Sequence, residues 1–251
     1  MPSFQPPIIE AVLDIECELP ADFSLPSLEK IAQEQLKASH PKKRHKLRFQ
    51  AEIQENPEES RLTKAEKTIE ALQFCTPDEK QIIQIRSTGF SFNRLVPYTS
   101  LDDYLPDIQQ AWSTYVQLAK PLSVKLVKMR YLNRISIPAA PEGIKIEEFF
   151  TIAPRDIPDC NLVMHQMLSR RTATDPETNS IVNLTIASEP FNPSITDVYP
   201  FILDIEVMKP EVCSADDWSG ILDKIQVLRG LKNKIFDNIL TEKCKTHLST
   251  H

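Results

Sequence analysis

The chain has 251 residues, of which 41% are hydrophobic and 25% charged, and it carries a formal net charge of −6 at pH 7. This composition is that of a globular protein whose length allows a sizeable core, in one large domain or in two closely packed halves. The acidic balance gives no overall attraction to nucleic acid, and the four widely separated glycines exclude the glycine-rich loops of the common nucleotide-binding folds.

Residues 6–18 alternate between apolar and acidic side chains, which predicts a half-buried β-strand with Glu10 and Asp14 on its polar face. An amphipathic pattern over residues 25–36 then predicts a helix, and Pro41 marks its end.

The alternation of residues 47–55 predicts a second strand. Residues 56–67 are highly charged and weakly patterned, so we expect an exposed excursion there. Residues 68–75 and 81–95 predict a hairpin closed by a polar turn that contains proline and aspartate. The apolar row changes phase within the second arm, which predicts a β-bulge at or near Gly89.

Ser100 and Asp103 resemble a capping box at the start of a helix that runs to about Ala119. Residues 122–137 then alternate as a strand with basic residues on one face. Residues 1–138 therefore predict a ferredoxin-like βαββαβ half with an elaborated central hairpin.

Residues 139–251 predict a second, β-rich half packed on the first, and the two halves together form an α+β protein with a mainly antiparallel sheet. Its elements are a proline-rich surface segment at 138–160 with a short helix near 146–150, a hairpin of 161–171 and 181–187 around a loop at 172–180, a strand at 201–207, and a long helix that Ser214 and Asp217 would open. The strand sequences VLDIEC at 12–17 and ILDIEV at 202–207 echo each other, either through duplication of a βα unit or by coincidence.

No stretch predicts a secretion signal or a membrane-spanning helix. The five cysteines are odd in number, widely scattered and without C-x-x-C spacing, and they are Cys17, Cys75, Cys160, Cys213 and Cys244. This pattern favours reduced thiols in the cytoplasm.

Three segments carry a resemblance to a known family: PPIIEAVLDI at 6–15, GFSFNRL at 89–95 followed by Pro97 and Tyr98, and RYLNRI at 130–135. In these segments the chain resembles a sporadically distributed family of uncharacterised bacterial proteins of about this length. The resemblance implies a self-contained unit encoded on mobile or accessory genes, and it implies no activity and no catalytic residue.

The strongest candidate for a site is a row of opposed charges. The first and last strands of a ferredoxin-like sheet are neighbours, so we expect Glu10 and Asp14 to lie beside Arg130 and Arg134, with Arg86 from the hairpin on the other flank. If the face is solvated, such pairs mainly fix the register of the strands. If the second half covers the face, the row becomes a polar binding cleft. The speculative binding residues are Glu10, Asp14, Arg86, Arg130, Asn133 and Arg134.

A basic run precedes the second predicted strand and would form a loop able to contact phosphate groups. Its residues are Lys42, Lys43, Arg44, His45, Lys46 and Arg48. This run makes nucleic-acid binding through residues 42–48 one alternative function.

The residue pattern assigns no metal, no cofactor and no catalytic group, because the histidines lack ligand spacing and no G-x-S-x-G motif is present. We therefore predict a binding or regulatory module for another macromolecule, with a protein partner or self-association and no membrane. The runner-up, ahead of nucleic-acid binding, is an enzyme of unidentified reaction with a polar cleft between the halves, in which Glu10 and Asp14 would be the acid–base candidates.

Overall fold

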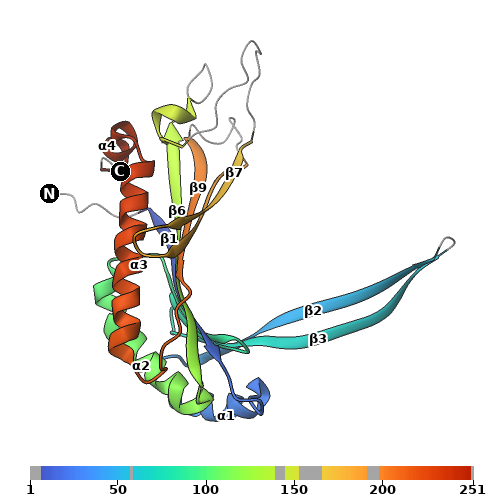
Figure 1. Cartoon of the computed structure of the whole chain (residues 1–251). Helices are drawn as coiled ribbons and strands as arrows, with labels where there is room; N and C mark the ends of the chain where they lie inside the picture. Colours follow the sequence, from blue (N-terminus) through green and yellow to red (C-terminus); the bar gives the residue numbers. More distant parts are fainter. Residues whose placement is uncertain (1–6, 57–58, 139–144, 153–165, 191–197, 250–251) are drawn as a thin grey trace.

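The computed structural model describes residues 7–56, 59–138, 145–152, 166–190 and 198–249, with the side chains of 50–65 left out. These residues form an α+β fold with one nine-stranded antiparallel sheet and four α-helices (Figure 1). The strands are β1 (Ile8–Glu18), β2 (Lys42–Asn56), β3 (Glu59–Cys75), β4 (Gln81–Arg86), β5 (Gly89–Leu95), β6 (Ser123–Pro138), β7 (Leu168–Asp175), β8 (Ser180–Ser188) and β9 (Val198–Lys209). The helices are α1 (Leu25–Leu36), α2 (Leu101–Ala119), α3 (Trp218–Ile239) and α4 (Glu242–Ser249), with a short 3₁₀ helix η1 (Ile146–Glu148).

The strands follow the order β2-β3-β4-β5-β1-β6-β9-β8-β7 across the sheet. β1 pairs antiparallel with β6, with Asp14 opposite Lys128, so the predicted pairing of the first strand with residues 122–137 is confirmed. β6 also pairs with β9 from Val127 to Pro138. The sheet is therefore continuous between the segments 1–138 and 139–251.

The helices lie on one face of the sheet and cover its apolar rows (Figure 1). Phe90 of β5 packs against Trp112 and Tyr115 of α2, with both ring centroids 5.7 Å away. All three rings are almost completely buried. In the described chain no helix lies on the opposite face, which carries the polar rows of the strands.

The predicted bulge at Gly89 is wrong, because residues 81–95 form two strands rather than one. β4 and β5 join through a tight turn at Ser87 and Thr88, and Ile85 lies directly opposite Phe90. The reversal of the chain, not an inserted residue, brings both apolar pairs to the helix-covered face.

The excursion predicted for residues 56–67 consists largely of two paired strands. β2 continues to Asn56 and β3 begins at Glu59, so the charged segment belongs to a long hairpin. Its register places Glu52 opposite Lys64, and such opposed charges favour strand pairing. β3 pairs with β4 only from Ala71 to Cys75. Residues 47–56 and 59–69 therefore form a two-stranded ribbon beyond the sheet, which we call the ribbon (Figure 1).

The helix caps agree with the sequence at one position and differ at another. The Ser100 hydroxyl accepts a hydrogen bond from the Asp103 backbone N–H, as the capping box predicts. α3, however, begins at Trp218 with Asp217 as its N-cap, and the Asp217 carboxylate accepts from the Gly220 N–H at 2.9 Å.

The predicted loop 172–180 is also shorter, since β7 continues to Asp175 opposite Ser180.

Candidate functional site on the polar face of the sheet

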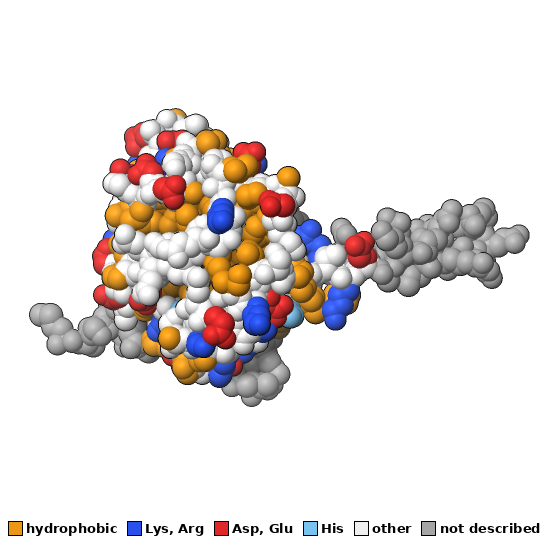
Figure 2. Space-filling view, turned by 90° about the horizontal axis from the view of Figure 1, so that it is seen from below, with side chains coloured by type: hydrophobic (Ala, Val, Ile, Leu, Met, Phe, Trp, Pro, Cys, Tyr) orange, Lys and Arg blue, Asp and Glu red, His pale blue; other side chains and the backbone are white. Residues whose placement is uncertain are grey.

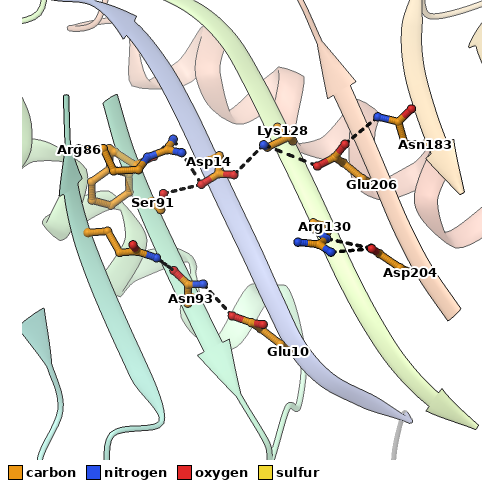
Figure 3. Close-up of polar contacts among 12 residues, drawn as sticks. Glu10, Asp14, Arg86, Ser91, Asn93, Lys128, Arg130, Asn183, Asp204 and Glu206 are labelled. Carbon is orange, nitrogen blue, oxygen red and sulfur yellow. Dashed lines mark hydrogen bonds and ion pairs between the residues drawn. The ribbon is translucent and has the colours of Figure 1, made fainter. Parts of the chain in front are cut away.

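Asp14 is the centre of a charged row on the polar face (Figure 3). Its carboxylate accepts a hydrogen bond from the Ser91 hydroxyl and lies 3.4 Å from Arg86 Nη2 and 3.1 Å from Lys128 Nζ. Lys128 continues the row to Glu206 at 3.6 Å. The Asp14 side chain is only 11% exposed. Since no described helix covers this face, the neighbouring side chains themselves shield it from water.

A second row crosses the other half of the face. Gln73 donates to Gln84 at 3.1 Å, Gln84 donates to Asn93 at 2.7 Å, and Asn93 donates to Glu10 at 2.8 Å. Gln84 and Asn93 each accept one hydrogen bond and donate another in this row, which fixes the orientation of their amides. Glu10 thus binds an amide and not the arginine that the sequence analysis expected.

The arginines of β6 take acidic partners from the second half of the chain. Arg130 forms a bidentate pair with Asp204, with Nη2 2.7 Å from Oδ2, and Arg134 Nε lies 2.6 Å from Glu189. The prediction that these two arginines pair with Glu10 and Asp14 is therefore wrong. The register explains the difference, because Arg130 lies opposite Val12 on one side and opposite Glu206 on the other.

Asn133 does not belong to this face. It is 2% exposed on the helix-covered side, where its amide donates to the backbone carbonyls of Tyr131 and Leu203 at 3.3 and 3.0 Å. Its side chain thus satisfies sheet carbonyls and cannot line a polar cleft with Arg86 and Arg130.

The basic run 42–48 lies in β2 and not in a loop, which corrects the sequence-based prediction. Three glutamates from other elements pair with it. The pairs are Lys42 and Arg44 with Glu79, Lys43 and His45 with Glu29, and Lys46 and Arg48 with Glu70. Arg44 and Lys42 hold the pKa of Glu79 below its ordinary value. Acidic and basic side chains accordingly lie together where the hairpin leaves the body (Figure 2).

The sequence analysis missed a half-buried cation between α3 and β6. The ammonium of Lys232 on α3 lies 4.2 Å from the centroid of the Tyr131 ring. The Tyr131 hydroxyl lies 3.3 Å from that of Tyr98, and Arg229 pairs with Asp102 at 2.7 Å nearby. The available signal was a lysine four residues after Leu228 within the apolar stripe of the long helix.

We expect the replacement of Lys232 by methionine to stabilise the protein at neutral pH. Burial, together with the nearby Arg229, lowers the pKa of Lys232 from 10.5 to about 8. The charged form is thus disfavoured in the folded state, and this penalty is fully present below pH 8 and disappears as the pH rises towards 10.5. After the loss of the cation–π contact is subtracted, we expect a gain of about 1 kcal/mol at pH 7.

Thermal denaturation of both proteins from pH 6.5 to 10 measures this effect, since groups that titrate in both cancel in the difference. A stability difference that stays constant over this range would contradict the pKa assignment.

A groove of about 520 Å³ lies between α3 and the β7–β8 hairpin. Its lining is mainly apolar, with Val182, Leu184, Leu231 and Ile235 among the lining residues. The one arginine in the lining, Arg171, donates to the Ile152 carbonyl at 3.4 Å. The groove offers contact area, and the carboxylate in its lining, Asp175, accepts hydrogen bonds from Thr178.

Within the described residues no group of histidine, cysteine, aspartate and glutamate side chains could hold a metal ion. Across the same residues, no helix has the length and apolar character needed to cross a membrane. No protein-family model and no curated protein sequence matches the chain.

Proposed function

We propose that this protein is a binding module for another macromolecule, which it contacts through the ribbon. The observation that carries the proposal is the separation of the ribbon from the sheet: β3 has a second neighbouring strand only at Ala71–Cys75, and β2 has none in the described chain. A two-stranded ribbon by itself is only marginally stable in water. A binding partner would supply the missing contacts.

The charged face supports binding or structural roles better than catalysis. Asp14 and Glu10, the acid–base candidates, are both engaged by neighbouring side chains. Glu206 and Asp204 are engaged in the same way. A general acid or base needs a proton position open to substrate. Within the described network, the oxygens of these carboxylates instead contact basic, hydroxyl or amide side chains of the neighbouring strands.

Nucleic-acid binding is the second candidate proposed, because Lys42, Arg44, Lys46 and Arg48 are each about half exposed, at 49, 49, 51 and 58%. Strand alternation places these four residues on one face of β2. Glu70 and Glu79 neutralise part of their charge, so we rank this candidate below a protein partner.

We expect that shortening the ribbon abolishes partner binding and leaves the fold intact. In the test variant an Asn-Gly turn replaces residues 48–68, which keeps every residue of β2 and β3 that lies within the nine-stranded sheet. The measurement is capture from nuclease-treated and untreated extracts, with thermal denaturation as the check on folding.

Leu168→Ala is the matched control, since Leu168 is 74% exposed on the other edge strand, β7. A partner that the shortened protein still captures in equal amount would refute the role of the ribbon. Material that is lost on nuclease treatment would identify nucleic acid and favour the second candidate.

The finer aspects of the sequence analysis stay proposals. We propose that β6-β1-β5-β4, with α1 and α2, is a ferredoxin-like core into which the β2–β3 hairpin is inserted; the strand order and the antiparallel pairings support this. We also keep membership of the sporadic bacterial family, and a cytoplasmic location, as proposals. The four described cysteines are unpaired thiols, which supports the location.

A further inference from the structure

β2 is a long edge strand. It has 15 residues, whereas the strand at the opposite edge, β7, has eight. In the described chain β2 pairs only with β3, so one side of its backbone has no partner strand. Soluble proteins keep edge strands short or cover them, because an open edge is a template for pairing with another chain. Because β2 is so long, we expect another strand to pair with its open side.

Among the described side chains of β2, the most exposed apolar one lies at the middle of the strand. Phe49 is 72% exposed, and the Lys67 ammonium lies 5.6 Å from its ring centroid. Seven residues of β2 precede Phe49 and seven follow it. Any antiparallel pairing of two β2 strands over their full length therefore places Phe49 opposite its own copy.

The sequence of β2 is complementary to itself in this register. Lys46 lies opposite position 52 of the other copy, which is glutamate, and Lys43 lies opposite position 55, also glutamate. Each pair occurs twice because of the two-fold symmetry, and no like charges face each other along the strand. If one strand is shifted by two residues along the other in one direction, Arg48 instead lies opposite its own copy. Opposite charges across a strand pair are favourable by about 0.2–1 kcal/mol each.

We propose that two copies of this chain associate through antiparallel pairing of their β2 strands, with the two-fold axis at Phe49, so that the two sheets become one. This inference rests on the proposed function, because it names a second copy of the chain as the macromolecule that the ribbon binds. The interface is of the β-augmentation type, in which backbone hydrogen bonds provide affinity and side-chain pairs fix the register.

A charge exchange tests the register. Lys46→Glu and Glu52→Lys each place like charges opposite one another twice in a homodimer, whereas a mixture of the two variants restores both pairs in a heterodimer. We expect sedimentation velocity to show a dimer for the original protein, dimerisation weakened at least tenfold for each variant alone, and a heterodimer in the mixture. The recovery in the mixture also shows that both variants fold.

Lys42→Glu is the matched control. Lys42 pairs with Glu79 at 3.0 Å within its own chain, as Lys46 pairs with Glu70 at 3.4 Å, but it lies opposite the neutral Asn56 in the proposed dimer. We expect this variant to dimerise within threefold of the original protein. A loss as large as that of Lys46→Glu, or a mixture that stays monomeric, would overturn the register.

A cross-link tests the position of the axis. Directly opposite Cα atoms lie about 4.5–5.5 Å apart in an antiparallel pair, which suits a disulfide. We therefore expect Phe49→Cys to form a covalent dimer on mild oxidation, and Leu168→Cys, at the opposite edge, to form none. An original protein that stays monomeric at 100 μM would overturn self-pairing while leaving the capture experiment with the shortened ribbon as a separate test of the proposed function.

Discussion

Replacing Gly89 by alanine is expected to destabilise the protein by about 3 kcal/mol or more. Gly89 has φ of +144°, a backbone conformation that L-residues with a side chain rarely adopt. A Cβ atom there would lie 2.1 Å from the carbonyl oxygen of Ile15 and 2.9 Å from the Cα of Glu16. Both obstacles are backbone atoms of β1, the central strand between β5 and β6. The substitution therefore has to displace the pairing of β1 and β5.

Gly230→Ala provides the matched comparison in urea denaturation. A Cβ atom at Gly230 meets no heavy atom within 4 Å, and the residue is exposed within α3. Alanine is favoured over glycine within a helix by about 0.5–1 kcal/mol, so this variant should be slightly more stable than the original protein. Equal effects of the two substitutions would show that β1 does not constrain Gly89.

The sequence predicts strands and helices well where apolar periodicity is long and undisturbed. The pairing of β1 with β6 followed from their opposed charges and was confirmed, although the individual partners were not. The reason is the register, which places Asp14 opposite Lys128 and Glu10 opposite Leu132, whereas Arg130 lies opposite Val12. Periodicity shows which face a residue occupies and contains no information about the register.

The hairpins were harder to predict. At Gly89 a phase change of the apolar row is equally consistent with a bulge in one strand and with a tight turn between two, and the choice depends on the neighbouring backbone of β1. In residues 56–67 the charged sequence suggests a loop, whereas the backbone forms a strand pair in which Glu52 lies opposite Lys64 in the register. The pattern within one segment does not show which other strand the segment pairs with.

The candidate site was predicted only in part. Arg86 and Asp14 are brought together as expected, at 3.4 Å. Asn133 was assigned to the same site, yet the position of a residue within the alternation places it on the helix-covered face with Tyr131 and Ile135. Lys232 was missed because a single lysine within an apolar stripe does not show which residues of the sheet its side chain contacts.

Asp14→Asn is expected to cost about 2–3 kcal/mol, more than any other single change in the charged rows. Asparagine preserves the size of the side chain and a hydrogen bond with Ser91, so the loss isolates the charge. Without that charge, Arg86 and Lys128, whose side chains are 16 and 20% exposed, face each other without an intervening anion. Among the described residues, the buried Arg86 Nε has no hydrogen-bond partner. After the substitution the Arg86 guanidinium would keep its hydrogen bond to the Phe90 carbonyl, at 3.2 Å.

Two double-mutant cycles distinguish this shielded row from an ordinary surface pair. For Asp14→Asn with Arg86→Gln we expect a coupling free energy above 1 kcal/mol, because removing both charges relieves the uncompensated cation. For Asp204→Asn with Arg130→Gln we expect less than about 1 kcal/mol, since the Arg130 side chain is 44% exposed and water screens its charge. Raising the salt concentration should reduce the second coupling and leave most of the first. Equal couplings with equal salt dependence would mean that water reaches Asp14 as freely as Asp204, and the row would then fix the strand register without contributing to stability.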